Sequence, residues 1–382
     1  MKRVYLDNAA TTPLDEEVLE AMLPFFREKY GNASSIHEMG REAREAIEKT
    51  REIIAKKLNA EPNEIVFTSG GTEANNLAIK GIALANKDKG KHIITQVTEH
   101  ACVLNACRWL EKLGYEVTYL PVDKYGMVKI EELEKAVRKD TILVSIMHAN
   151  NEIGTIQPIQ EIAKICKENN IYFHTDACQS FCKEPLDMKK MEIDLITINA
   201  HKLHGPKGVG ALVIKEGTKI TPLLHGGGHE FGLRSGTENV PGIVGFGKAV
   251  EIMNSQVVEK IRKLRDRLTD RILKEIENVR LNGHPEKRLC SIANFSFLGI
   301  EGESLVLRLD SKGIFCSTAS ACSSKKLEPS HVLKALNLKP EEIQGAVRFS
   351  FGKQNSVEEI DYAVDVLKEE VANLRKISPY QP

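Results

Sequence analysis

The sequence predicts an α/β protein with a mostly parallel central sheet covered by helices on both faces, plus a smaller α+β domain. Two observations carry this prediction. From about residue 64 to residue 214, short runs rich in Val and Ile alternate with helical segments, and such runs are typical of buried parallel strands. After residue 214 the alternation stops, and a long amphipathic segment leads into a second set of strands and helices.

Length and composition set the class of protein. The chain has 382 residues, which is enough for two or three domains. Lys and Arg number 53, as do Asp and Glu, so nothing favours a nucleic-acid partner. No apolar run approaches the length of a membrane span, and the first eight residues have no signal core. We therefore expect a cytoplasmic protein with no membrane partner.

The cysteines do not predict a zinc site or a disulfide framework. None of the eight forms a Cys-x-x-Cys pair, and no export signal is present. We expect most of them to be small buried side chains, with one or two reactive at most. They are Cys102, Cys107, Cys166, Cys178, Cys182, Cys290, Cys316 and Cys322.

The predicted elements follow in chain order. Strands are expected at residues 4–6, 64–67, 92–95, 116–120, 141–147, 171–175, 195–198 and 209–214. Helices are expected at about 16–29, 41–58, from 73, 101–113, 130–138 and 159–169. The last third is expected to hold strands near 291–297 and 347–351, and helices near 257–279, 302–309 and 356–375, the last opened by a capping box.

The helix at about 257–279 is interpreted as the bridge between two domains. We expect a large cofactor-binding domain at 14–256. A small domain would combine 1–13 with 257–382 and carry a mobile cysteine loop at about 316–330.

Four polar residues follow predicted strands. His100, Asn151, Asp176 and Lys202 fall just beyond strand ends, and ligands in parallel sheets bind at the carboxyl ends of the strands. A lysine between two strands is a candidate for a desolvated amine that forms a Schiff base with an aldehyde cofactor. The alternative is a solvated loop lysine.

Three further features match the needs of pyridoxal phosphate. Asp176 could pair with the pyridinium nitrogen, although a helix cap or turn is the alternative. The glycines before Thr72 precede a helix and could cradle the phosphate, although a plain tight turn is the alternative. His100 could cover the ring and exchange protons near neutral pH. Together these features predict a pyridoxal phosphate site.

A separate thiol points to a second chemical role. Cys322 lies in a serine-rich stretch, and Lys325 and Lys326 nearby would favour its thiolate. The alternative is an incidental loop cysteine. Two histidines in the glycine-rich loop, His225 and His229, lack carboxylate or cysteine partners, so no metal site is expected.

These residues lie in motifs that resemble those of the cysteine desulfurases of the NifS/IscS type. That family is a branch of the class V aminotransferase-like pyridoxal phosphate enzymes, which have the PLP-dependent transferase fold of type I. Thr72-Glu-Ala-Asn-Asn76 and Ala149-Asn-Asn-Glu-Ile-Gly154 carry most of the weight. The matching segments span nearly the whole chain: 5–13, 67–76, 98–100, 148–158, 201–202, 205–210, 226–230, 233–237 and 320–324.

The resemblance implies how the cofactor is held. Lys202 would bind it covalently and take the substrate's Cα proton. His100 would stack on the ring and move protons, Asp176 would pair with the ring nitrogen, and Gln179 would bond the ring hydroxyl. The remaining cofactor contacts, mostly to the phosphate, would come from Gly71, Thr72, Asn151, Asn199, His201 and, from a second subunit of a homodimer, Thr237.

The resemblance also implies the reaction. Asn151 and Arg348 would bind the carboxylate of L-cysteine, a task that suits the bidentate arginine fork. Cys322 would accept the sulfur as a persulfide, L-alanine would leave, and an iron–sulfur scaffold protein would receive the sulfur. Cys322 could also be a transient ligand of a nascent cluster.

Three positions depart from the family pattern. Asn199 stands where serine is usual, Cys178 where a small apolar residue is usual, and Cys182 where glycine is common. We expect the two cysteines to be packing variants. Two alternative functions remain: another class V enzyme, such as a selenocysteine lyase or an aminotransferase, or a non-enzymatic partner that has lost its cofactor chemistry.

Overall fold

A seven-stranded sheet organises the first part of the chain. The structure is a computed structural model that describes residues 2–318 and 329–379. The strand order is β2-β8-β7-β6-β5-β3-β4, parallel from β7 to β4, with β8 antiparallel to both of its neighbours. The mostly parallel sheet is therefore confirmed. Its strands are β2 (Ile65–Thr68), β3 (His92–Gln96), β4 (Glu116–Leu120), β5 (Thr141–Ser145), β6 (Tyr172–Asp176), β7 (Leu195–Asn199) and β8 (Gly210–Ile214).

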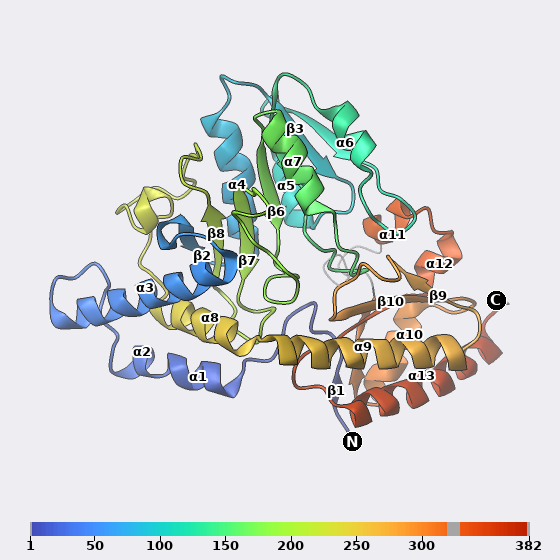
Figure 1. Cartoon of the computed structure of the whole chain (residues 1–382). Helices are drawn as coiled ribbons and strands as arrows, with labels where there is room; N and C mark the ends of the chain where they lie inside the picture. Colours follow the sequence, from blue (N-terminus) through green and yellow to red (C-terminus); the bar gives the residue numbers. More distant parts are fainter. Residues whose placement is uncertain (1, 319–328, 380–382) are drawn as a thin grey trace.

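Both faces of this sheet are covered because its side chains alternate along each strand. Val66 packs with α4 and α5 on one face, whereas Ile65 and Phe67 pack with α3, α7 and α8 on the other. Figure 1 shows this sandwich of helices around the green strands. The covering helices are α3 (Glu38–Leu58), α4 (Gly71–Ala85), α5 (Ala101–Glu111), α6 (Ile130–Ala136), α7 (Ile159–Glu168) and α8 (Val240–Ile252).

A second, four-stranded sheet has the order β12-β13-β10-β9 and is antiparallel throughout. The long helices α9 and α13 lie side by side below it (Figure 1). The N-terminal β1 (Val4–Tyr5) pairs in parallel with β11 (Ile314–Phe315), so the first strand joins the last third of the chain. The other elements are β9 (Val279–Asn282), β10 (Ile292–Phe297), β12 (Ser317–Thr318), β13 (Ala346–Ser350), α9 (Ser255–Glu275), α10 (Gly302–Ser311) and α13 (Val357–Ile377).

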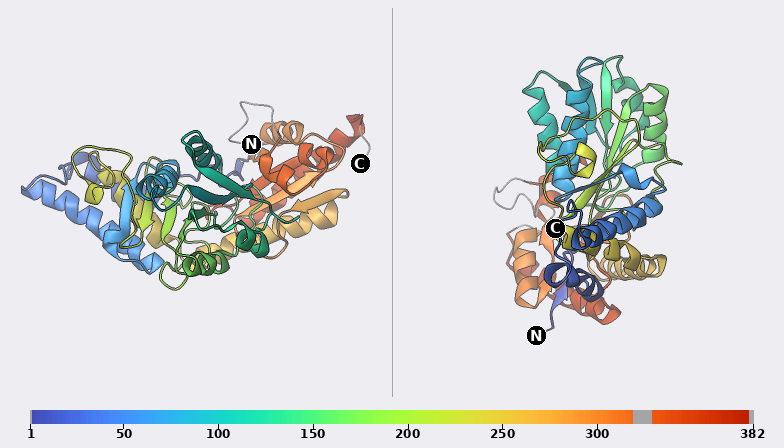
Figure 2. Two further views of the ribbon diagram at one scale, coloured as in Figure 1. Left: turned by 90° about the horizontal axis from the view of Figure 1, so that it is seen from above. Right: turned by 90° about the vertical axis from the view of Figure 1, so that its left-hand side faces the viewer.

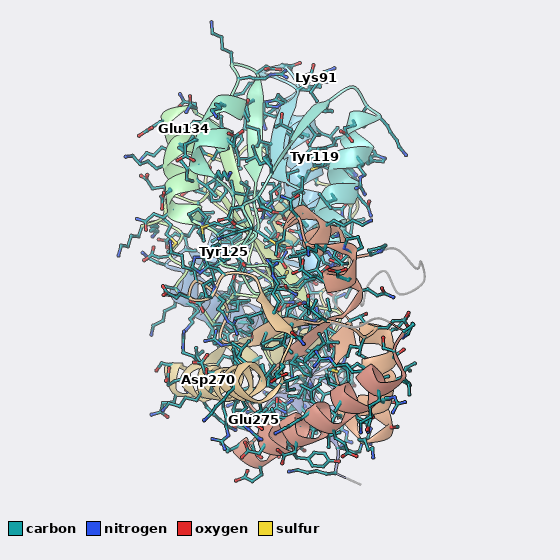
Figure 3. All side chains as sticks on the ribbon, turned by 90° about the vertical axis from the view of Figure 1, so that its right-hand side faces the viewer. Lys91, Tyr119, Tyr125, Glu134, Asp270 and Glu275 are labelled. Carbon is teal, nitrogen blue, oxygen red and sulfur yellow. The ribbon has the colours of Figure 1, made fainter. Side chains whose placement is uncertain are left out.

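The two sheets meet through defined contacts. Seen from above, the molecule is elongated, with α3 near one end and the second sheet near the other (Figure 2). Figure 3 places Lys91 at one end, Asp270 of α9 near the other and Tyr125 between them. The ring of Tyr125 lies 5.2 Å from the ring of His284, centroid to centroid, and a β-bridge joins Thr155 to Arg288.

Several element boundaries differ from the prediction. The helix expected at 16–29 is two helices, α1 (Glu16–Met22) and α2 (Pro24–Arg27), because Pro24 has no amide hydrogen to continue the first. The helix expected to reach residue 279 ends at Glu275, and β9 follows. The short helices α11 (His331–Ala335) and α12 (Pro340–Gln344) were not predicted.

Helix α8 was also not predicted, and its glycines explain why. Glycine lowers helix propensity, but here it allows close packing. A Cβ at Gly245 would lie 2.6 Å from the sulfur of Met22, and one at Gly247 would lie 2.8 Å from the hydroxyl of Thr50. Within the described ranges, no helix is both long enough and apolar enough to cross a membrane.

Candidate active site

The lysine that follows β7 meets the N-terminal segment. Lys202 Nζ donates to the carbonyls of Ala9 and Ala10, the second at 2.7 Å. Gln179 Nε2 donates to the same carbonyl of Ala9 at 3.0 Å. The segment after β1 therefore brings together two predicted site residues from different loops of the large sheet.

Asp176, the last residue of β6, has two hydrogen-bond donors. Asn75 Nδ2 donates to its Oδ2 at 2.6 Å, and the amide of Cys178 donates to its Oδ1 at 2.9 Å. Both carboxyl oxygens of this buried side chain therefore have a hydrogen-bond donor. Sequence reasoning quoted Asn75 only as part of a motif. Its spacing from Gly71, one helical turn, was the available signal that it faces the sheet.

His100 caps α5 and lies between two charges of the site. Its Nδ1 accepts from the amide of Cys102 at 3.2 Å, which leaves the ring proton on Nε2. Burial lowers the pKa of His100; the positive charge of Lys202 lowers it further, while Asp176 opposes this. The imidazole is therefore neutral at neutral pH and lies within electrostatic reach of both residues.

A cavity of about 420 Å³ lies at the N-terminus of α4. It is lined by Gly71, Thr72 and His201, together with Ala10 and Thr11 of the N-terminal segment. The exposed amides and the dipole of this helix favour an anion. Burial and nearby lysine charges, that of Lys202 first, lower the pKa of His201 to about 4, so its ring is a neutral hydrogen-bonding group.

Pyridoxal phosphate fits these residues. The amide oxygens of Asn75, Gln179 and Asn199 are buried and have no hydrogen-bond partner among the described residues. Leaving such a group unpaired costs about 1–3 kcal/mol, so three of them around one site indicate a missing polar occupant. Asn199 also faces the α4 cavity, because its Nδ2 would lie 3.5 Å from a Cβ at Gly71. The arrangement supplies an amine, a carboxylate and an anion cradle in one place.

Arg348 lies in the middle of β13, between β12 and β10 of the second sheet. Its Nη2 pairs with Asp7 Oδ1 at 2.8 Å, and its Nη1 donates to the carbonyl of Asn151 at 2.9 Å. The side chain is 3% exposed, and its Nε is buried with no partner in the described part of the chain. Sequence reasoning missed Asp7, although Asp7 belongs to the quoted motif at 5–13.

One predicted residue is not brought into this group, and another lies outside the described residues. Thr237 is exposed and does not line the α4 cavity. Cys322 lies outside the described residues, as does most of the cysteine loop predicted at about 316–330.

The two unusual cysteines behave as packing residues. Burial raises the pKa of both thiols, that of Cys182 to about 12, so neither is a thiolate at neutral pH. Cys182 has a φ of 60°, a left-handed conformation that favours glycine. This conformation explains why glycine is common at that position.

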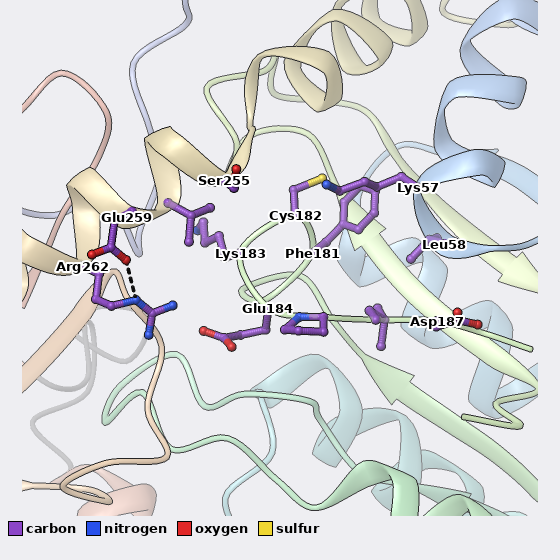
Figure 4. A pocket seen from close by; sticks show the side chains of 13 residues that line it. Lys57, Leu58, Phe181, Cys182, Lys183, Glu184, Asp187, Ser255, Glu259 and Arg262 are labelled. Atoms are coloured by element: carbon purple, nitrogen blue, oxygen red, sulfur yellow. Dashed lines mark ion pairs between the residues drawn. The ribbon is translucent and has the colours of Figure 1, made fainter. Parts of the chain in front are cut away.

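A second cavity, of about 540 Å³, lies between the end of α3 and the start of α9 (Figure 4). Its lining shares no residue with the α4 cavity. Two of its charged residues, Arg262 and Glu259, pair with each other at 3.5 Å. We assign it no role in the reaction.

Comparison with known proteins agrees with this geometry. The family model for class V aminotransferases matches residues 4–363. A cysteine desulfurase IscS of Methanosarcina thermophila is 57% identical over 100% of this chain and 95% of its own length. One of Dictyoglomus turgidum is 56% identical over 100% and 98%.

Solved structures give the same result. A NifS-like protein superposes with a TM-score of 0.92 at 44% identity, covering 98% of this chain and all of its own. SspA in complex with cysteine superposes with a TM-score of 0.84 at 38% identity, covering 92% and 100%. The chain therefore belongs to the class V aminotransferase family and, within it, to the cysteine desulfurases of the NifS/IscS type.

Proposed function

We propose that this protein is a pyridoxal phosphate-dependent cysteine desulfurase that converts L-cysteine to L-alanine and holds the released sulfur as a persulfide on Cys322. The observation that carries the proposal is the meeting of Lys202 and Gln179 at the carbonyl of Ala9, beside Asp176 and the α4 cavity. The cysteine desulfurases above 50% identity support the choice of substrate.

The cofactor would be held from three sides. Lys202 would bind it covalently, Asp176 would pair with the ring nitrogen, and Gln179 would bond the ring hydroxyl. The phosphate would lie in the α4 cavity, held by Gly71, Thr72, Asn199 and His201, with Thr237 reaching in from the partner of a homodimer. When bound, pyridoxal phosphate supplies an electron sink for the negative charge that develops at the substrate's Cα.

The side chains around the cofactor would manage the protons. Lys202 Nζ would accept the Cα proton, because it is the amine at the centre of the site. His100 has a neutral ring that carries its proton on Nε2, so it would donate to the reacting groups from that atom. Asn75 would hold the carboxyl of Asp176 in place through its hydrogen bond.

Arg348 would orient the substrate. Its Nε is the buried donor without a partner, and a carboxylate is the acceptor that an arginine binds most strongly. The contacts with Asp7 and the carbonyl of Asn151 would hold the guanidinium in place.

Cys322 would then take the sulfur. Its thiolate attacks the substrate's sulfur, a new S–S bond forms, and the bond between that sulfur and the substrate's Cβ breaks. Protonation at Cβ gives alanine, so the atoms and charges balance. Cys322 is only four residues after Thr318, the last residue of β12. These four residues can span at most about 14 Å of extended chain. An iron–sulfur scaffold protein is the acceptor we propose for the persulfide sulfur.

Two variants test this function. With L-cysteine, Cys322→Ala should keep the absorbance of the bound cofactor but form no protein persulfide, and Lys202→Ala should lose the covalent link to the cofactor. Alanine and the persulfide are measured by mass spectrometry, with Cys316→Ala, a change at a half-buried cysteine between β11 and β12, as the control. Full sulfide release by Cys322→Ala without added thiol would contradict the mechanism. A keto-acid half-reaction in place of alanine and persulfide would favour an aminotransferase.

A further inference from the structure

The chain on both sides of the Cys322 segment is anchored beside the proposed substrate site. On the N-terminal side, Ser317 pairs with Arg348 and Thr318 pairs with Val347 through the antiparallel contact of β12 with β13. On the C-terminal side, α11 begins after Ser330 and packs Val332 into the core. This second anchor is made by side chains and can therefore be tested by substitution.

Ser330 makes two hydrogen bonds at once. Its hydroxyl donates to Glu152 Oε2 at 2.5 Å and accepts from the amide of Leu333 at 3.2 Å, which caps α11. The next residue, His331, contacts the carbonyl of Glu99 through Nε2 at 2.9 Å. That carbonyl belongs to the peptide that precedes His100. The start of α11 is thus bonded to two loops at the edge of the large sheet.

Glu152 is an unusual partner for a serine because it is a buried carboxyl. Its side chain is 6% exposed, and Ser330 is its only side-chain hydrogen-bond partner among the described residues. Burial raises its pKa to about 7, against the opposing effects of Ser330 and of the positive charge of Arg348. Arg348 of β13 is the charged group that faces it, and Ser330 of α11 is the polar one.

Glu152 is also coupled to the substrate-facing arginine through the backbone. The carbonyl of Asn151, one residue earlier, accepts from Arg348 Nη1 at 2.9 Å. The carbonyl of Glu152 itself accepts from Asn294 Nδ2 of β10 at 3.1 Å. One short segment therefore contacts the arginine on one side and the start of α11 on the other.

We propose that Glu152 and Ser330 are positioning residues for sulfur transfer, which hold the chain that follows Cys322 against the segment that fixes Arg348. The proposal rests on the proposed function of Cys322. Neither residue touches the reacting atoms. Their contact fixes the start of α11, to which the chain after Cys322 is connected. It therefore affects the transfer of sulfur rather than the binding of cofactor or of L-cysteine.

Tryptic cleavage after Lys325 and Lys326 tests the contact without any turnover. Glu152→Leu removes the acceptor but leaves the cap from Ser330 to Leu333 in place, so a capping role alone would not change the result. We expect Glu152→Leu and Ser330→Ala to speed cleavage at least fivefold, and Ser330→Thr to stay within twofold of wild type. The matched control is Glu184→Leu, at a half-buried carboxyl elsewhere, which should leave the rate unchanged.

The pH dependence of cleavage provides a second readout, normalised to a free peptide of the same sequence. Protonation of Glu152 replaces a charged acceptor with a neutral one, so wild-type cleavage should rise as the pH falls from 8 to 6. Glu152→Gln, which is always neutral and keeps an acceptor, should show no such rise. This variant also serves if Glu152→Leu does not fold.

Kinetics separate this proposal from the proposed function. Glu152→Leu should lower the rate of persulfide formation at least fivefold and change the KM for L-cysteine less than twofold. Cleavage rates of Glu152→Leu and Ser330→Ala within twofold of wild type, in an active enzyme, would overturn the positioning role alone. The expected cleavage pattern in a protein that forms no persulfide would instead overturn the function proposed for Cys322.

Discussion

The two sheets of this protein hold the key polar side chains of the site differently. At the edge of the large sheet, the amide oxygens of Gln179 and Asn199 are buried and have no hydrogen-bond partner among the described residues. In the small sheet, Asn282 Nδ2 donates to both Asn294 and Ser296, and Arg348 pairs with Asp7 and the carbonyl of Asn151, while Arg348 Nε has no partner among the described residues.

This difference matches the two ligands of the proposed function, a resident cofactor and an exchanging substrate. A resident cofactor can complete the hydrogen bonds of the large sheet, so groups left open there are not a defect. A substrate that comes and goes must leave a stable protein behind, and the ion pair with Asp7 keeps the buried charge of Arg348 compensated when the substrate departs. The large sheet therefore suits a permanent occupant, and the small sheet suits an exchanging one.

The largest expected effect tests the small sheet. Arg348→Ala should lower kcat/KM for L-cysteine about 100-fold, because a charge-assisted contact with the substrate carboxylate is lost. The affinity for pyridoxal phosphate, measured by fluorescence titration, should change less than threefold. A large loss of cofactor affinity would break the comparison, because Arg348 would then serve both ligands. Arg280→Ala, on the exposed side of β9, is the control.

The next effect tests the large sheet. A Cβ at Gly71 would lie 2.5 Å from the sulfur of Cys178, so Gly71→Ala should distort the cavity and weaken cofactor binding about 10-fold. Adding Cys178→Ala removes the clashing sulfur and should restore affinity to within threefold, with Cys178→Ala alone as the control. If the double variant binds no better than Gly71→Ala, the clash with Cys178 is not the cause.

The smallest effect is a pH dependence of stability that has opposite signs for two buried histidines and for a buried glutamate. Burial lowers the pKa of His148 and His174 in the large sheet to about 4. The stability from these neutral histidines is present above pH 6.5 and lost as the pH falls toward 4. Burial raises the pKa of Glu99 to about 8, so its contribution is present below pH 4.5 and lost as the pH rises through 8.

Urea unfolding at several pH values measures how the free energy of unfolding changes with pH on the acid and on the alkaline side. Between pH 7 and pH 8 the free energy of unfolding should fall by about 1 kcal/mol from Glu99 alone. Glu99→Gln should flatten that fall and make the rise between pH 4.5 and 6.5 steeper, because Glu99 opposes the histidines there. An equal fall in Glu99→Gln would show that other groups control the alkaline side.

Periodicity predicted the large sheet well because each strand contains a short run rich in β-branched and apolar residues. The runs at 92–95, 116–120 and 195–198 became β3, β4 and β7 with ends shifted by one residue or less. Helix α8 escaped prediction because its glycines are needed only where α1 and α3 approach it closely, and no local pattern reveals that approach. β1 was expected as a strand, but its partner β11 is some three hundred residues away in sequence.

The candidate site divides in the same way. Residues at strand ends, such as Asp176 and Lys202, could be proposed from position and chemistry. The groups that hold them could not, because Asn75 and Asp7 act through contacts that only the fold creates. The contact of Glu152 with Ser330 joins positions 178 residues apart, and nothing in either local sequence marks it.

The pairing of β1 with β11 bears on how the protein is made in the cell. Lys202 donates to Ala9 and Ala10, and the segment that carries them is tied by β1 to residues near 314 and by Asp7 to Ser350 and Arg348. During translation the large sheet can form early, while the first thirteen residues still lack their strand partners. The site around Lys202 is therefore completed only when residues near 314 and 350 are available to pair with the first strand and Asp7.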